Sequence, residues 1–208
     1  MKILPMVASC AVLIAASATS ADATTLVLGT NGGSQVLDLG GADAGLVSPG
    51  AVNANPDAAL PLGGSGEFIA AEPGAPVTLD LSSFAKISSL AFIWGSADAA
   101  SGYNDLTVLG KDGSTLLTYT GAQVLALAGG TVSGSQSDPL SNPWVTLKFG
   151  ADQTNVGKLV FNSNAIAFEA SNFTLALPEA GTWAMMIVGV GLAGGALRRR
   201  NKMTLRYS

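Results

Sequence analysis

The stretch "ISSLAFIWGSADAASGYNDLTVLGKDGSTLLTYT", Ile87–Thr120, decides the fold class of this chain. Its segment "LAFIW" is apolar at every position, which predicts a strand that is buried on both faces or lies at the centre of a sheet. Two further strand patterns, "DLTVLG" and "STLLTYT", flank the turn "KDGS", where Asp112 and Gly113 supply the positive φ angles of a hairpin. Strands joined by such a turn indicate an antiparallel, all-β domain.

Short apolar runs broken by turn residues continue on both sides of this stretch. Ten strands are expected in all: TLVLG from Thr25, EFIAA from Glu67, PVTLDL from Pro76, ISSLAFIW from Ile87, DLTVLG from Asp105, STLLTYT from Ser114, WVTLKF from Trp144, KLVFN from Lys158, AIAFEA from Ala165 and NFTLAL from Asn172. This spacing predicts a jelly-roll-like β-sandwich over residues 24–177. Residues 120–130 fit a short helix or a strand, while residues 40–65 and 129–143 are expected to be loops.

Composition excludes several functions. The 208-residue chain has 12% charged residues and 26 glycines, which suits a turn-rich extracellular β domain. It has no histidine, and its only cysteine is Cys10, so Ser-His and Cys-His catalysis are excluded. Residues 24–177 carry four lysines, no arginine and twelve carboxylates, a formal charge of −8 that argues against nucleic-acid binding. We therefore expect a protein that is not an enzyme.

The N-terminal segment "MKILPMVASCAVLIAASATSADA", residues 1–23, has the features of a signal peptide. One lysine precedes an apolar run, and Ala21 and Ala23 form a small-residue cleavage pattern that would leave Thr24 as the first mature residue. The alternatives are a buried strand, an uncleaved anchor or a lipoprotein signal. The lipoprotein pattern, "VASC" ending at Cys10, comes too early, because cleavage there would leave "AVLIAA" on the mature protein.

The C-terminal segment, residues 178–208, predicts a single transmembrane helix. Ala180–Leu197 contains 18 uncharged residues, about 27 Å of helix, which is just enough to cross the hydrocarbon core of a bilayer. Arg198–Arg200 follow at once and would keep that end on the cytoplasmic side. The alternative is a buried C-terminal core helix.

This tail resembles the PEP-CTERM sorting signal in its PEPxxWA variant. The residues that carry the resemblance are Pro178, Glu179, Trp183, Ala184, Arg198, Arg199 and Arg200. Ala180 departs from the pattern, because the family usually has a second proline there. The resemblance implies an exported protein that is anchored transiently in the inner membrane of a Gram-negative bacterium. The transpeptidase exosortase would cut it near the motif, and the protein would then reach the cell surface or the extracellular matrix.

The body of the chain, from about residue 60 to residue 177, is similar to a group of exosortase-dependent surface proteins. The residues that carry this similarity are Trp94, Gly95, Ser96, Tyr103, Asn104, Leu106, Phe168 and Glu169. That group has no assigned biochemical activity. The similarity therefore implies a location and a fold rather than a chemistry.

Two constellations could bind ligands. Asp98, Asn104 and Asp105 follow a buried strand and offer oxygen ligands for calcium, although Asp and Asn at such positions also cap turns. Trp144 and Tyr103 are candidates for a sugar-binding face, whereas Trp94 lies in an apolar run and is expected in the core.

The sequence thus predicts a structural or adhesive protein linked to exopolysaccharide or biofilm. Its expected partners in sorting are exosortase and, transiently, the inner membrane. The alternative is a carbohydrate-binding module of the cell surface that uses Trp144. A hydrolase is disfavoured because the chain offers no convincing pair of carboxylates.

Overall fold

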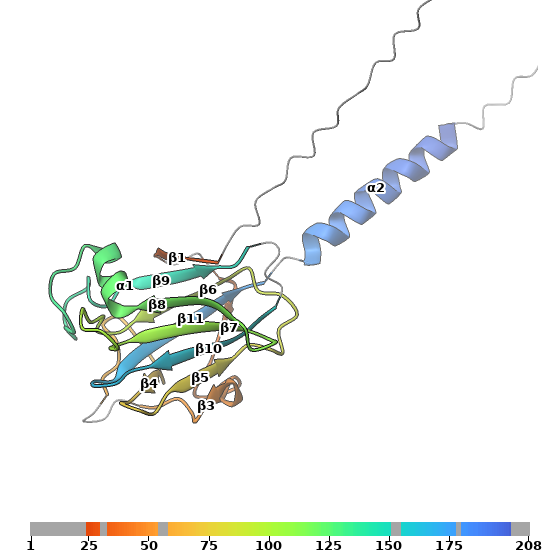
Figure 1. Ribbon diagram of the computed structural model, residues 1–208. Coiled ribbons are helices and arrows are strands. Elements are labelled where there is room, and N and C mark those ends of the chain that lie inside the picture. Colours follow the sequence, from red (N-terminus) through yellow and green to blue (C-terminus); the bar gives the residue numbers. More distant parts are fainter. Residues whose placement is uncertain (1–23, 30–32, 54–57, 151–154, 178–179, 201–208) are drawn as a thin grey trace, which may run out of the picture.

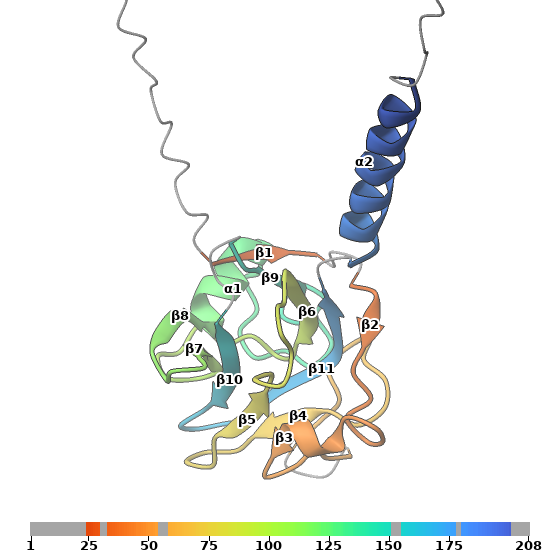
Figure 2. The same ribbon diagram turned by 90° about the vertical axis from the view of Figure 1, so that its right-hand side faces the viewer.

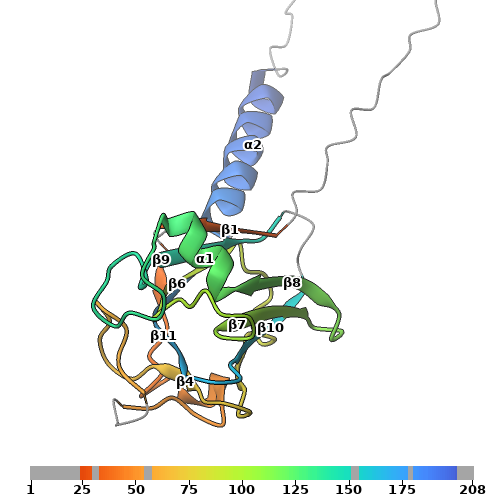
Figure 3. The same ribbon diagram turned by 60° about the vertical axis from the view of Figure 1, so that its left-hand side comes forward.

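The computed structural model describes residues 24–29, 33–53, 58–150, 155–177 and 180–200. The predicted signal peptide, residues 1–23, lies outside the described residues, as do Pro178 and Glu179 of the sorting motif. Two antiparallel sheets stack face to face (Figure 1), and the two layers are clearest in Figure 3. The prediction of an all-β sandwich is confirmed.

The first sheet has the strand order β1-β9-β6-β11-β2, and β4 also pairs with β11. Its strands are β1 (Thr25–Leu28), β2 (Gln35–Val36), β4 (Ile69–Ala71), β6 (Ser89–Trp94), β9 (Trp144–Lys148) and β11 (Phe168–Ala176). The second sheet has the order β3-β5-β10-β7-β8. Its strands are β3 (Val47–Ser48), β5 (Val77–Asp80), β7 (Asp105–Gly110), β8 (Thr115–Thr120) and β10 (Val156–Asn162). From β4 to β11 the chain passes repeatedly between the sheets, so almost every pairing joins strands distant in sequence.

The core lies between the two sheets and is rich in aromatic rings. Strand β6 is buried at all six positions, which confirms the expectation for "LAFIW", and Trp94 is fully buried as predicted. The ring centroids of Phe92 and Phe173 lie 5.2 Å apart, and those of Phe161 and Phe168 lie 5.3 Å apart. Phe161 comes from β10 of the second sheet, so its contacts with Phe92, Phe168 and Phe173 of the first sheet join the two layers.

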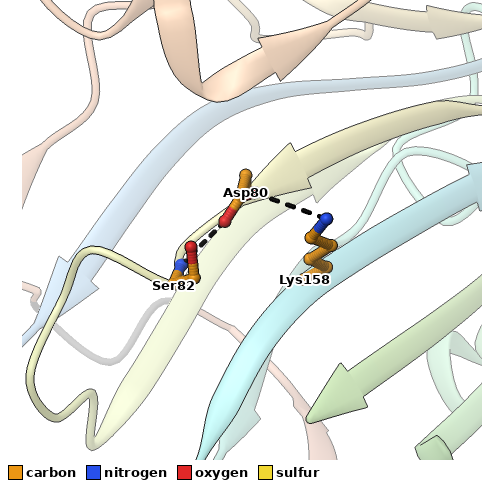
Figure 4. A network of polar contacts seen from close by, with 3 residues as sticks. All are labelled: Asp80, Ser82 and Lys158. Carbon is orange, nitrogen blue, oxygen red and sulfur yellow. Dashed lines mark hydrogen bonds and ion pairs between the residues drawn. The ribbon is translucent and has the colours of Figure 1, made fainter. Parts of the chain in front are cut away.

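The outer face of the second sheet carries an ion pair. Lys158 on β10 stands opposite Asp80 on β5, and their charged atoms lie 3.5 Å apart. The backbone N–H of Ser82 also donates to Asp80 Oδ1 at 2.9 Å (Figure 4). Hydrogen bonding by Ser82 is the main cause that lowers the pKa of Asp80. Both charged side chains are exposed, so the pair stabilises the fold only slightly.

The last part of the sandwich differs from the prediction. The two strands expected from Ala165 and from Asn172 form a single strand, β11, and this part of the prediction is wrong. A bulge between Ser171 and Thr174, where Asn172 has a φ of 57°, lets pairing with β6 continue past the interruption in the pattern. The loop expected over residues 40–65 also contains β3 and the short 3₁₀ helix Ala44–Leu46.

The hairpin and the helix after it are built from local signals. In the β7–β8 turn only Gly113 takes a positive φ, of 82°, while Asp112 Oδ1 accepts the backbone N–H of Ser114 at 3.0 Å. Residues 121–128, which fitted a helix or a strand, form α1 (Gly121–Ala128). Thr120 and Gln123 form a capping box at its start, and Gly129 ends it with a φ of 70°.

A second helix, α2 (Ala180–Arg200), stands away from the sandwich (Figures 1 and 2). Its backbone includes Trp183, Ala184 and Arg198–Arg200 of the proposed sorting motif. Among the residues that the structure describes, no helix combines the length and the apolarity that a membrane crossing requires, so the transmembrane helix predicted for Ala180–Leu197 is not found there.

Candidate functional site: the Trp144 pocket

A pocket of about 610 Å³ lies on the outer face of the first sheet. Its strand residues are Trp144 at the start of β9 and Asn172 and Thr174 on β11. Thr174 lies between two residues that point into the core, so its own side chain points to the opposite face. Val36 at the end of β2 and two loop segments, residues 37–40 and 65–67, complete the lining.

Asn172 joins the pocket to the loop that covers it. The backbone N–H of Ser65 donates to Asn172 Oδ1 at 2.9 Å, and Asn172 Nδ2 donates to Ser65 Oγ at 3.4 Å. The bulge in β11 redirects the Asn172 side chain, which a regular strand would place differently. A left-handed backbone at a residue that lines a pocket is a feature often found at binding sites.

The rim of the pocket is acidic. Asp38 and Glu67 line it, whereas its lining residues include no lysine and no arginine. The Nδ2 group of Asn53 donates to Glu67 Oε1 at 3.3 Å. Gly40 lies directly against the Glu67 side chain, since a Cβ there would stand 2.9 Å from Glu67 Cδ. The turn that carries Asp38 and the strand that follows Glu67 therefore meet at this rim.

Trp144 and Tyr103, the two aromatic residues predicted for ligand binding, are not brought together. Trp144 is half-buried and forms part of the pocket. Tyr103 is also half-buried, but it lies in the loop before β7 and does not line the pocket. The pocket residues that the sequence analysis missed are Asp38, Glu67, Asn172 and Thr174. Only strand alternation around Thr174 could have indicated an outward side chain, because the loops that supply the acids have no periodic pattern.

A second polar site is buried at one end of the sandwich. Ser96 Oγ donates to Glu169 Oε2 at 2.8 Å, and the backbone N–H of Ser96 donates to Asn142 Oδ1 at 3.0 Å. Asn142 Nδ2 in turn donates to the carbonyl oxygens of Ser135 and Asp138 at 2.7 and 2.9 Å. Glu169 is only 3% exposed, and burial raises its pKa while the Ser96 hydrogen bond opposes that rise. We call these residues the Ser96–Glu169 node.

Most of the residues on which the expected similarity to a surface-protein group rests gather at this node. The rings of Trp94 and Phe168 have centroids 4.5 Å apart, and the backbone N–H of Gly95 donates to the carbonyl oxygen of Glu169 at 2.8 Å. Asn104 is fully buried, and its Oδ1 accepts the backbone N–H of Asp98 at 2.8 Å. These residues therefore hold loops and strands together, and they do not line the Trp144 pocket.

The calcium candidates show the geometry of a capped loop. Asn104 Oδ1 is already used by the Asp98 backbone, and Asp98 Oδ1 accepts the Ser133 hydroxyl at 2.9 Å. Burial raises the pKa of Asp98 and of Asp105, which disfavours their charged forms. Across the residues that the structure describes, no three side chains of the Asp, Glu, Cys or His type converge on a metal position. This geometry fits the turn-capping alternative.

Comparison of the chain with protein-family models, with curated proteins and with solved structures gave no match.

Proposed function

We propose that this chain is an exported protein of a Gram-negative bacterium, with a structural or adhesive role at the cell surface or in an exopolysaccharide-rich biofilm matrix. The observation that carries this proposal is the apolar surface of α2. Among its described side chains, the large apolar ones are between 53% and 74% exposed: Met185, Met186, Ile187, Val188, Val190 and Leu192. A helix on a soluble domain normally buries an apolar stripe and exposes a polar face, so these side chains need another environment.

The proposed environment is a membrane, reached before the protein is sorted. In the sequence, the uncharged run Ala180–Leu197 and the cluster Arg198–Arg200 support a transient inner-membrane anchor with its basic end in the cytoplasm, while the described part of α2 alone does not meet the length and apolarity of a crossing helix. The resemblance of Pro178, Glu179 and Trp183 to a sorting motif supports exosortase as the partner that removes this tail. Signal peptidase would remove residues 1–23 in the same pathway.

The strand order supports a jelly roll as the fold of the exported domain. Apart from the β7–β8 hairpin, successive strands from β4 to β11 lie alternately in the two sheets. The resulting orders are β4-β11-β6-β9 in the first sheet and β5-β10-β7-β8 in the second, which is the arrangement that two interlocked Greek keys produce. We propose this topology as the scaffold. It leaves loops at the ends of the sandwich and an outer sheet face free for contacts with the matrix.

Terminal sequencing and intact mass of protein recovered from the cell surface and the medium test the sorting proposal. We expect the loss of Met1–Ala23 and of everything after about Leu177–Ala180. Changing Glu179 and Trp183 to alanine together should leave the protein in the inner membrane, whereas Arg206→Ala, outside the motif, should change nothing. Surface delivery of the Glu179/Trp183 variant at the normal level would refute the assignment.

A second candidate function, saccharide binding, is favoured by the position of Trp144 in the pocket. An indole face suits the apolar C–H face of a sugar ring, and amide and hydroxyl groups beside it suit sugar hydroxyls. On a glycan array, Trp144→Ala should lose binding, while Tyr103→Ala, outside the pocket, should retain it. Retention by Trp144→Ala would exclude this site.

The proposal assigns no catalytic activity and no cofactor to the chain. The buried Glu169 carboxyl is occupied by Ser96 and by the backbone of Ala59, at 2.8 and 3.5 Å. Glycosidase activity that disappears on Glu169→Gln would overturn this part of the proposal.

A further inference from the structure

The charge of the Trp144 pocket restricts the kind of saccharide that it can hold. Asp38 and Glu67 give the lining a formal charge of −2, and no basic side chain opposes them among the lining residues. Lys148 is the basic residue on the strand that carries Trp144, and it lies four residues further on, about 13 Å along the strand. An anionic sugar would therefore meet uncompensated repulsion in this pocket.

The backbone of Asp38 and the side chain of Glu67 are held in place, and both carboxylates keep free acceptor capacity. The backbone of Asp38 is fixed, because its N–H donates to Asp43 Oδ2 at 2.9 Å and its carbonyl oxygen accepts the N–H groups of Gly41 and Asp43. Its own carboxylate has no hydrogen-bond partner among the described residues. Glu67 uses Oε1 to accept the Asn53 amide, and Oε2 has no partner among the same residues. Two oxyanions at a positioned rim are suited to an ammonium group.

The wall and the floor of the pocket supply uncharged groups. Trp144 provides an aromatic wall. Thr174 Oγ1 is shielded from solvent, so Thr174 contributes packing surface to the floor and no hydrogen bond to a ligand. Asn172 Nδ2 makes one hydrogen bond, to Ser65 Oγ, and carries a second N–H. The Asn172 amide matches the hydroxyls of a sugar ring, so the carboxylates remain available for a cationic substituent.

We propose that the Trp144 pocket binds saccharides that carry free amino groups, with the ammonium toward Asp38 and Glu67 and the sugar ring against Trp144. This inference rests on the proposed saccharide-binding function and names its ligand class. Uronic acids are disfavoured. Because both carboxylates are at least partly exposed, each contributes a factor of a few, and together they favour the amino sugar over its neutral counterpart on the order of tenfold at low salt.

Titration calorimetry on the full chain tests the proposal, in a detergent whose headgroup is not a sugar. The probes are three oligosaccharides of equal length, built from glucosamine, from glucose and from galacturonic acid. Mildly acidic buffer keeps the sugar amines protonated and the uronates ionised. The variants are Asp38→Asn with Glu67→Gln, Trp144→Ala, and Glu72→Gln as a control, since Glu72 is an exposed carboxylate outside the pocket. Thermal unfolding of each variant checks that it is folded.

The glucosamine probe should bind most tightly, the glucose probe less tightly and the galacturonate probe least. High salt should reduce these differences in affinity. The double variant should bind the glucosamine and glucose probes with similar affinity, Trp144→Ala should bind neither, and Glu72→Gln should behave as the unaltered protein. If galacturonate binds as well as glucosamine, or if the double variant keeps the order unchanged, the ligand class is wrong while saccharide binding at Trp144 stands. If none of the three probes binds, the saccharide-binding function fails together with this inference.

Discussion

Ser96 and Glu169, 73 positions apart in the sequence, are joined by a 2.8 Å hydrogen bond from the Ser96 hydroxyl to Glu169 Oε2. The bond connects the loop after β6 to β11, at the end of the sandwich where Asn142 fixes a third segment. Glu169 is buried there with no basic partner, since its hydrogen bonds come from neutral donors. The node therefore joins three segments of the fold, but ionisation of the buried Glu169 lowers the free energy of unfolding.

The first prediction concerns the pH dependence of stability. Burial raises the pKa of Glu169, so the folded chain holds this proton over a pH range in which the unfolded chain has lost it. The free energy of unfolding should therefore fall as pH rises through that range, starting at the unfolded pKa. Glu169→Gln cannot ionise and should remove part of this fall, which urea unfolding between about pH 4 and pH 8 would measure.

Asp80 provides a control of opposite sign. Its pKa is lowered by hydrogen bonding to Ser82, so its contribution is present above the unfolded pKa and is lost as pH falls. Asp80→Asn should therefore lower the free energy of unfolding above the unfolded pKa, and it should change the pH dependence only on the acid limb. The raised pKa values of Asp98 and Asp105 leave a residual fall in Glu169→Gln. Identical pH profiles for Glu169→Gln and the unaltered protein would contradict the assignment to Glu169.

The second prediction concerns the space at Gly95. A Cβ at this position would lie 2.8 Å from the carbonyl oxygen of Glu169 and 2.8 Å from Pro61 Cγ. Gly95→Ala should therefore lower the free energy of unfolding by about 2–3 kcal/mol, because backbone and ring must move apart. Gly45→Ala is the matched control, since nothing lies within 4 Å of its Cβ, and it should stay within about 0.5 kcal/mol. Equal stabilities of the two variants in urea would disprove the close packing.

The third prediction concerns the aromatic core. The Phe92 ring contacts three other rings, those of Trp94, Phe161 and Phe173, with centroids 6.1, 5.8 and 5.2 Å away. Phe92→Ala should lower the free energy of unfolding by about 3–5 kcal/mol, since it leaves a cavity between the sheets. The exposed Leu140 serves for comparison, and Leu140→Ala should cost far less. A small effect of Phe92→Ala in denaturant titrations would mean that the sheets can close the cavity.

The fourth prediction concerns the start of α1. Gln123 N–H donates to Thr120 Oγ1 at 3.3 Å, and Thr120 N–H donates to Gln123 Oε1 at 2.9 Å. Thr120→Ala should cost about 1 kcal/mol in global stability, because one N–H at the helix start loses its acceptor. Thr120→Ser keeps the acceptor oxygen and should therefore retain most of the stability that Thr120→Ala loses. Hydrogen exchange of the Gln123 amide should become faster in Thr120→Ala but not in Thr120→Ser.

Local patterns predicted much of the sandwich. The unbroken apolar run Leu90–Trp94 and the strand pattern Asp105–Gly110 became β6 and β7, because the period of apolar residues indicates whether a strand is buried on two faces or on one. The choice between helix and strand at Gly121–Ala128 was also within reach, because Thr120 and Gln123 form a recognisable capping box. The two ends of the chain were read from composition, and their role in export remains a prediction.

Other features were decided only when distant segments came together. The bulge at Asn172 merges two predicted strands, because β6 supplies hydrogen bonds on both sides of the interruption. The Trp144 pocket combines residues from 36–40, 65–67, 144 and 172–174, and the Ser96–Glu169 node joins equally distant loops. Sequence determines which residues can form strands and turns, since those preferences act over a few residues. The pairing order of the strands decides which side chains share a pocket, because strands that are far apart in the chain can pair by hydrogen bonds and bring their side chains together.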